Sequence, residues 1–395
     1  MSFNIALTGL SAVNEQLDTI SNNIANVGTT GFKSSRTEFG SIYADSQAMG
    51  VEVLGQTQSI SQGGSLVSTG RDLDMAISGG GFFVTKASTG NMNYTRAGVF
   101  GTDKSNYIVN ASGQRLQGYP IDANGNLLTG TMSDLQLQNA NLQAKATDSL
   151  AFVMNLDANE SVPAIAPFDP SNANTFNSTY TTKVFDSQGK EHTLTQYFIK
   201  TGDNTWDVHY YADGTDLAAP RNLVFNTAGQ IVTPAAPVNV TFAPAGVDPV
   251  NVAVDYNRST QTGSNFVVTT NGASGYASGE QIGIAVEKDG KVYANYSNGE
   301  RMLQGQVALA NFANLGGLQN ESGTSWTETS ESGAPIIGVP GIGIFGELRT
   351  GALENSNVDL TQQLVGLMES QRNYQANTKV ISTDKELTQV LFGAI

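Results

Sequence analysis

Residues 2–27, SFNIALTGLSAVNEQLDTISNNIANV, place apolar side chains at alternating steps of three and four along the chain. This spacing is typical of a heptad seam, the face along which one helix packs against another. A helix of this length is only marginally stable in water by itself. We therefore expect a helix that needs a partner, with the seam residues Phe3, Ala6, Leu10, Val13, Leu17, Ile20, Ile24 and Val27.

The other end of the chain carries a looser stripe of the same kind. Polar Gln371 and Thr378 occupy two of its seam positions, and its apolar members are Leu360, Leu364, Leu367, Tyr374 and Ile381. We predict a second helix over residues 360–395 that pairs with the first as a coiled coil. Such a pair could pack within one globular chain or join several copies of it, and the periodicity alone does not separate these interpretations.

Between the two ends, the composition favours a β-rich body. The chain has 395 residues, of which 39% are hydrophobic, 43 are glycine and only 11 are proline. Threonine, serine, asparagine and valine are frequent, and with so many glycines they are typical of strands joined by tight turns. The length favours two or three domains. The predicted fold is therefore mainly β with α-helical termini.

The charge and the residue types argue against several classes of protein. A net charge of −15 with only 20 lysines and arginines disfavours nucleic-acid binding, which depends on neutralising phosphates. The absence of cysteine excludes disulfides and thiolate metal sites. No stretch approaches the ~20 apolar residues of a membrane span, so we expect no membrane insertion. The N-terminus also lacks the cationic start of a cleavable signal peptide.

Turn signals divide the body of the chain into strands. We predict a hairpin over residues 82–94 and a three-strand meander over residues 180–211. Asp289-Gly290 and Asn298-Gly299 predict two more tight hairpin turns. If the two terminal helices pair with each other, both ends of the chain lie in one region. The middle of the chain then leaves this region and returns to it. We therefore expect a nested architecture, in which a second β domain is inserted in the first.

The chain is therefore expected to form seven consecutive segments. They are an N-terminal coiled-coil helix, an extended linker, the first part of a first β domain, an inserted outer β domain, the second part of the first β domain, a return linker and a C-terminal coiled-coil helix. Their expected boundaries are, in the same order, 1–27, 28–70, 71–149, 150–281, 282–345, 346–359 and 360–395.

No pattern in the chain predicts a catalytic, cofactor or metal site. Residues 341–346, GIGIFG, fit the spacing of a dinucleotide-binding loop, but no βαβ pattern surrounds them, so a turn is the better interpretation. His192 and His209 are expected on neighbouring strands, where they could pair across the sheet. Two histidines without further ligands are poor evidence for zinc, and surface positions are more common for such residues. We therefore predict no enzymatic activity and no cofactor.

The end of the first helix carries a more specific motif, NNIANVGTTGFK at residues 22–33. Its characteristic members are Asn22, Asn23, Asn26, Gly31, Phe32 and Lys33. Further motifs lie in the first β domain and near the C-terminus, at 69–77 (TGRDLDMAI), 81–83 (GFF), 94–96 (YTR), 355–360 (NSNVDL) and 369–377 (ESQRNYQAN). In these motifs the chain resembles the bacterial flagellar axial proteins, the family of rod and hook subunits. Simple rod subunits lack a large inserted β domain, so the insertion of roughly 130 residues favours a hook subunit within that family.

The resemblance implies a structural subunit that polymerises into the curved flagellar hook, a flexible universal joint that transmits motor torque to the filament. It implies that the terminal helices line a tube as a packed layer and that the β domains form outer shells. The partners it implies are copies of the chain, the adjacent rod and hook–filament junction proteins, the hook cap and the flagellar export apparatus. It also implies an extracellular location, reached by type III export without a cleavable signal peptide.

Two alternatives stay open at the level of sequence. A distal rod protein or a hook-associated axial protein would share the motifs at both ends. A secreted β-rich carbohydrate-binding protein or glycosidase would account for the acidity, the glycine-rich turns and aromatic residues such as Trp206, Tyr210 and Tyr211. It would not account for the two terminal seams.

Overall fold

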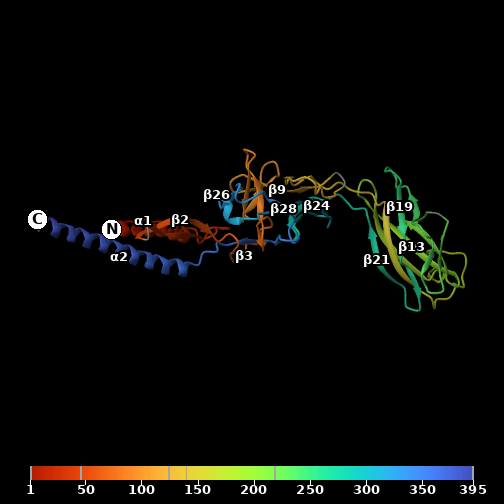
Figure 1. The fold of residues 1–395 in the computed structure, drawn as a ribbon. Coiled ribbons are helices and arrows are strands. Elements are labelled where there is room, and N and C mark those ends of the chain that lie inside the picture. The colour runs from red at the N-terminus through yellow and green to blue at the C-terminus, as the bar shows by residue number, and fades with distance from the viewer. Residues whose placement is uncertain (1, 45–46, 123–124, 139, 218, 394–395) are drawn as a thin grey trace. The chain divides into compact units, whose positions relative to one another are not determined.

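The computed structural model describes residues 2–44, 47–122, 125–138, 140–217 and 219–393, which form two compact units. The terminal unit comprises Met1–Asn139, Gly283–Asn295 and Arg301–Ile395. The inserted unit comprises Ala140–Ile282 and Tyr296–Glu300. The chain thus leaves the terminal unit and returns to it, with a helix at each end and strands between them (Figure 1). The predicted fold class, mainly β with helical termini and nested domains, is confirmed.

The two helices are α1 (Ser2–Ala25) and α2 (Leu360–Gly393). They lie side by side within the terminal unit, as Figure 1 shows in red and blue, so the predicted pairing of the termini is confirmed. Because α1 ends at Ala25, the last predicted seam residue, Val27, lies in the turn that follows the helix and is exposed.

The chain after α1 forms a hairpin. Strand β1 (Ser35–Ala44) pairs antiparallel with β2 (Gln47–Gln58), and the hairpin packs along α1. The segment 28–70, predicted as an extended linker, thus contains two extended strands that pair with each other. Pairing is favoured because each strand satisfies backbone N–H and C=O groups of the other next to a helix that excludes water.

The remaining strands of the terminal unit build the first β domain, together with a 3₁₀ turn at Leu315–Gly317. The strands are β3 (Leu66–Ser68), β4 (Met75–Ser78), β5 (Phe82–Lys86), β6 (Met92–Thr95), β7 (Phe100–Thr102), β8 (Ile108–Asn110), β9 (Arg115–Pro120), β10 (Ser133–Asp134), β22 (Gln281–Val286), β23 (Lys291–Tyr296), β24 (Arg301–Val307), β25 (Leu309–Asn311), β26 (Gln319–Glu321), β27 (Ser325–Thr327), β28 (Ile336–Gly338), β29 (Glu347–Thr350) and β30 (Ala352–Glu354). The main sheet runs in the order β22-β23-β24-β9-β5-β6-β27-β26. Two small antiparallel pairs, β29 with β4 and β3 with β30, join the returning chain to the segment that follows the first hairpin.

Strand β5 lies at the centre of this domain and is buried on both faces. Because side chains alternate along a strand, neighbouring phenylalanines enter two different cores. The ring of Phe83 packs 5.3 Å from that of Phe100 in one core, and Phe82 packs 5.5 Å from Trp326 in the other. The predicted hairpin over residues 82–94 is confirmed as the pair β5–β6.

The inserted unit contains two sheets and a 3₁₀ turn at Ala173–Thr175. One sheet contains β12 (Ser178–Phe185), β13 (Glu191–Gly202), β14 (Thr205–Ala212), β15 (Thr215–Asp216), β16 (Arg221–Phe225) and β17 (Ile231–Thr233). The other contains β11 (Ser149–Asp157), β18 (Val238–Phe242), β19 (Val250–Asp255), β20 (Thr260–Thr262) and β21 (Val267–Ala273). The predicted three-strand meander is confirmed as β12-β13-β14. Both sheets contribute to one apolar core, in which Phe152, Phe198 and Trp206 are fully buried.

Candidate functional site: the paired termini and their junction

The terminal helices run antiparallel in a constant register. Asn23 Nδ2 of α1 donates to Gln363 Oε1 of α2 at 3.1 Å. Further along, a Cβ atom added to Gly366 would lie 3.3 Å from Ile20, and one added to Gly9 would lie 3.0 Å from the side chain of Asn377. From one contact to the next, each step toward the N-terminus of α1 is matched by an equal step toward the C-terminus of α2.

The structure buries only part of the seam predicted for α1. Ala6, Val13 and Ile20 are buried, whereas Leu10, Leu17 and Ile24 are half-buried. Phe3, near the start of the helix, stays exposed. One partner helix and one hairpin therefore leave apolar surface of α1 in contact with solvent.

On α2 the predicted stripe and the contact face differ. Leu360, Leu364 and Tyr374 are exposed, and Leu367 and Ile381 are half-buried. The contacts with α1 at Gln363, Gly366 and Asn377 involve small or polar residues instead, and Ser370 on the same helix is fully buried. Periodicity of apolar residues could not find them. Their signal was the small-residue pair Gly366 and Ser370, four apart on one helix face.

Asn23 ties three elements together at the end of α1. Its Oδ1 accepts a hydrogen bond from the N–H of Ser35 at 2.9 Å, and its Nδ2 donates to the carbonyl of Ser35 at 2.8 Å and to Gln363. The amide thus pairs with the start of β1 as a neighbouring strand would, while it also contacts α2. One turn earlier, Thr19 Oγ1 lies 2.8 Å from Thr37 Oγ1 of β1.

The other asparagines of the motif close the end of the helix. Asn26 Nδ2 donates to the carbonyl and to the Oδ1 of Asn22, both at 3.0 Å, and Thr29 Oγ1 donates to Asn26 Oδ1 at 3.1 Å. Gly31 then takes a positive φ of 73°, and an added Cβ would lie 2.5 Å from the backbone nitrogen of Ala97. Glycine is therefore required at this position for two reasons, its backbone conformation and the close approach of another segment.

Lys33, the last residue of the motif, lies in a buried ion cluster. Its Nζ donates to Glu354 Oε1 at 2.6 Å and to the carbonyl of Gln62 at 2.7 Å. The other carboxylate oxygen of Glu354 accepts from Arg96 at 3.3 Å, and Arg96 also donates to the carbonyl of Gly79 at 2.9 Å. Burial lowers the pKa of Lys33 and of Arg96 from their ordinary values, and Glu354 opposes this effect in both.

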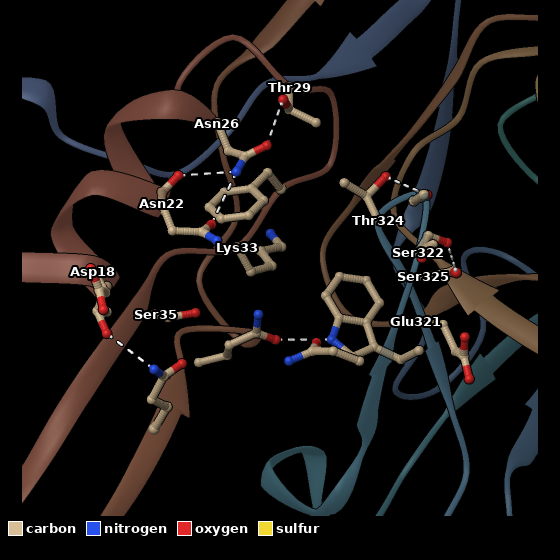
Figure 2. Close-up of a pocket in the computed structure, with 17 residues that line it drawn as sticks. Asp18, Asn22, Asn26, Thr29, Lys33, Ser35, Glu321, Ser322, Thr324 and Ser325 are labelled. Carbon is tan, nitrogen blue, oxygen red and sulfur yellow. Dashed lines mark hydrogen bonds between the residues drawn. The ribbon is translucent and has the colours of Figure 1, made fainter. Parts of the chain in front are cut away.

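A polar hollow of about 640 Å³ lies beside this junction (Figure 2). Asp18, Asn22, Asn26 and other residues of α1 and the motif line one side, with Phe32 half-buried among them. The chain from Asn320 to Trp326 lines the other side, and Trp326 Nε1 donates to Gln58 Oε1 at 2.9 Å. The hollow thus lies between residues of the motif and the first β domain. Hydrogen-bonding groups line both of its sides, so it is suited to polar contacts.

The remaining sequence candidates lie outside this site. His192 is buried, not on the surface as expected, because its ring lies between Asp213 (2.6 Å) and Asp186 (3.2 Å). Burial lowers the pKa of His192, but the two carboxylates outweigh it and leave the pKa above its ordinary value. His209 instead packs 4.3 Å from the ring of Phe168. Within the described ranges, no group of three or more histidine and acidic side chains is placed to hold a metal ion.

The glycine-rich stretch at residues 341–346 forms a turn, as predicted. The N–H of Gly341 donates to the carbonyl of Gly346 at 3.0 Å, and both Gly341 and Gly343 have positive φ. Among the described helices, none is long and apolar enough to span a membrane.

Family models match four stretches that together frame most of the chain. They are described as flagella basal body rod protein (residues 3–33), flagellar hook protein FlgE/F/G D1 domain (76–149), flagellar basal body protein FlaE D2 domain (155–276) and flagellar basal body rod FlgEFG protein C-terminal (349–392).

Curated relatives match over the full length. The flagellar hook protein FlgE of Escherichia coli (strain K12) is 39% identical over 401 residues, which cover 99% of each chain. FlgE of Salmonella typhimurium is 39% identical over 410 residues with the same coverage, and FlgE of Rhizobium meliloti is 36% identical and covers 98% of this chain and 96% of its own. Full-length agreement with hook proteins does not favour a rod, hook-associated or carbohydrate-binding protein.

A solved structure agrees in fold. The crystal structure of Helicobacter pylori flagellar hook protein FlgE2 matches with a TM-score of 0.55 at 15% identity, covering 73% of this chain and 100% of that one. With the helix pair, the inserted β unit and the full-length relatives in agreement, the chain belongs to the flagellar hook protein family and is a subunit of the flagellar hook.

Proposed function

We propose that this chain polymerises through its paired terminal helices and that the resulting tube acts as a flexible universal joint, which transmits motor torque to the filament. The observation that carries the proposal is the apolar surface left on the helix pair within a single chain. Leu364 is 46% exposed on α2, and Phe392 near its C-terminal end is 74% exposed. Covering such side chains stabilises an assembly by roughly 1.5–3 kcal/mol each on full burial.

The constant register of the pair adds a second argument. Because α1 begins at Ser2 and Gly9 lies opposite Asn377, the C-terminal part of α2 extends beyond the start of α1. Its exposed Leu387 and Val390 therefore have no cover from α1. Copies of the same chain would supply that cover, as expected for a layer of packed helices.

In this proposal the polymerisation seam comprises Phe3, Leu10, Val13, Leu17, Ile20, Ile24, Val27, Leu360, Leu364, Leu367, Tyr374 and Ile381. The expected segments 1–27 and 360–395 form the inner layer of the tube. The β segments 71–149, 150–281 and 282–345 form shells outside it and slide past their neighbours as the tube bends.

The proposed partners follow from membership of the family, which implies polymerisation within the flagellar axial structure. They are further copies of the chain, the adjacent rod and hook–filament junction proteins, the hook cap and the flagellar export apparatus. We further propose that the chain works outside the cell, as a structural protein without enzymatic activity, cofactor, nucleic-acid partner or membrane insertion.

The test places a charge on the exposed stripe of α2. Leu364→Asp changes a side chain that a single chain leaves exposed, so the folded monomer is expected to remain intact while tube formation is lost. Ala376→Asp, also exposed but on another face of α2, is the matched control and is expected to assemble. Assembly is observed by electron microscopy, and the Ser35 amide, which donates to Asn23, reports the intact monomer by hydrogen exchange. Wild-type tubes from Leu364→Asp would remove this stripe from the mechanism.

A further inference from the structure

The buried cluster of Lys33, Arg96 and Glu354 joins three segments of the chain that are far apart in sequence. Lys33 lies between α1 and β1, Arg96 follows β6, and Glu354 ends β30. The bonds of Glu354 reach all of them: its side chain accepts from Lys33, Arg96 and the N–H of Gly64, and its backbone carbonyl accepts from the N–H of Gly31 at 2.8 Å. One residue thus holds the end of the helical region, the return strand and the first β domain together.

The charges of this cluster are unbalanced. Lys33 is 1% exposed, Arg96 4% and Glu354 1%, so two cations share one carboxylate with almost no access to water. In the described part of the chain, Glu354 is the acidic group that forms ion pairs with both. The guanidinium also has a buried Nε without a hydrogen-bond partner, and it lies 5.3 Å from the ring of Phe82.

An unbalanced buried cluster responds unequally to the loss of its members. Removing either cation leaves a balanced pair of one cation and one carboxylate. Removing the charge of Glu354 leaves two cations that repel each other in a site closed to bulk solvent, and an uncompensated buried charge is strongly destabilising. Packing alone predicts no such asymmetry, because a glutamine has nearly the shape of a glutamate.

We propose that Glu354 is the positioning residue of an ionic joint that fixes the terminal helices and their motif to the first β domain. Its negative charge keeps the joint closed against the mutual repulsion of Lys33 and Arg96. The helix pair and the β domain each have contacts of their own, through Asn23 with Gln363 and through the Phe83 core, so the joint controls their connection and not the folding of either.

The test measures amide hydrogen exchange in the full-length monomer. Gly31 and Gly64 donate directly to Glu354 and report the joint, whereas Ser35, which donates to Asn23, reports the helix region. Glu354→Gln is expected to speed exchange at Gly31 and Gly64 roughly 10²–10³-fold, as the loss of one partner in a buried ion pair implies. Exchange at Ser35 and in the β5 core is expected to stay within about tenfold of wild type.

The other variants separate charge from packing. Lys33→Met and Arg96→Met are each expected to change exchange at Gly31 and Gly64 less than about tenfold, because each leaves a balanced pair. Combining both with Glu354→Gln removes all three charges and is expected to restore protection at least about tenfold relative to Glu354→Gln alone. Glu38→Gln, in the exposed pair with Arg36, is the matched control and is expected to behave as wild type.

Three results would overturn the inference. Equal effects of the three single variants would mean that packing holds the joint. Failure of the triple variant to improve on Glu354→Gln would mean the same, and it keeps the test decisive if Glu354→Gln folds poorly. A uniform rise of exchange over α1 and the β5 core would make Glu354 a general stabiliser of the unit. None of these readouts depends on polymerisation.

Discussion

The inserted unit and the paired terminal helices differ in how far they bury their apolar side chains. In the inserted unit, two sheets close on one core, and Phe152, Phe198 and Trp206 are fully buried. The terminal helices bury few large side chains, and the amide of Asn23 hydrogen-bonds both to Gln363 of α2 and to Ser35 of the hairpin. The first region has a closed core within one chain, whereas the second retains exposed apolar surface, which further copies cover in the proposed assembly. In that proposal, one protein combines a self-sufficient β body with terminal helices that are completed by assembly.

The contrast is tested most strongly in the inserted core. Phe152 packs against Tyr180, Phe198 and Tyr256 with ring centroids 5.4–6.1 Å apart. Phe152→Ala is expected to lower the free energy of unfolding of this unit by about 3–5 kcal/mol, because it removes buried surface and leaves a cavity. Denaturant unfolding measures the loss. The exposed Val162→Ala is the control, and a loss below about 1 kcal/mol for Phe152→Ala would show that the core is not self-sufficient.

At the termini, polar contacts are expected to carry the stability of the pair. Asn23→Ala removes three hydrogen bonds and takes the side-chain partner away from the N–H and carbonyl of the half-buried Ser35, so we expect a loss of about 2–3 kcal/mol in the terminal unit. Thermal unfolding and exchange at the Ser35 amide measure it. The exposed Asn22→Ala is the matched control and is expected to cost less than about 0.5 kcal/mol. Equal losses would mean that the amide bridge does not hold the helices.

The inserted unit should also depend on pH in a way that the termini do not. The raised pKa of His192 contributes stability that is fully present below about pH 6.5, its unfolded value, and is lost as the pH rises through the folded pKa. The lowered pKa values of Asp186 and Asp213 contribute stability that is present above their unfolded values and lost in acid. These three groups favour a maximum of the Tm between about pH 4 and 6.5, whereas the pKa of His209 in the same unit is lowered by burial and removes stability as the pH falls below about 6.5.

His192→Gln tests this pH dependence, because glutamine cannot carry the charge. In this variant the Tm is expected no longer to fall as the pH rises above about 6.5, whereas the fall of the Tm in acid is expected to remain. Calorimetry at a series of pH values measures both limbs. An unchanged alkaline limb in His192→Gln would assign the pH dependence to other groups.

The smallest change is expected on the outer face of the terminal hairpin. Arg36 and Glu38 form an ion pair at 2.6 Å, but both side chains are exposed, and such pairs are screened by water and salt. Glu38→Gln is expected to leave the Tm of the terminal unit unchanged within error. A clear loss would indicate that the hairpin depends on surface charge more than its contacts with α1 suggest.

The features that were predictable from sequence are those with a local signal. The seam from Phe3 to Ile24 predicted α1, and turns such as Asn298-Gly299 predicted hairpins, since both depend on residues close together in the chain. The hairpin β1–β2 was missed because the residues over Ser35–Gln58 are mostly polar or small and alternate weakly. Their pairing depends on the neighbouring helix, which no local pattern records.

The contacts of the site itself were missed for a different reason. Gly366 and Gln363 of α2 meet α1 through small size and through hydrogen bonding, not through hydrophobicity. Lys33 and Arg96 were visible as members of motifs, but their common partner Glu354 was not. Only the fold brings such distant residues together. A single sequence therefore shows the individual charged residues but not that they form one cluster.

The distance along the chain between these partners has a consequence for folding kinetics. Asn23 and Gln363 are 340 residues apart, and Lys33 and Glu354 are 321 apart, so closing the terminal unit requires a very long loop. Most strand pairs of the inserted meander join immediate neighbours in the chain. Since pairing between distant residues slows folding, we expect the inserted unit to fold first. Until α2 pairs with it, α1 lacks its partner helix. We therefore expect the chain to be most susceptible to aggregation and to proteases between the folding of the inserted unit and the pairing of the two helices.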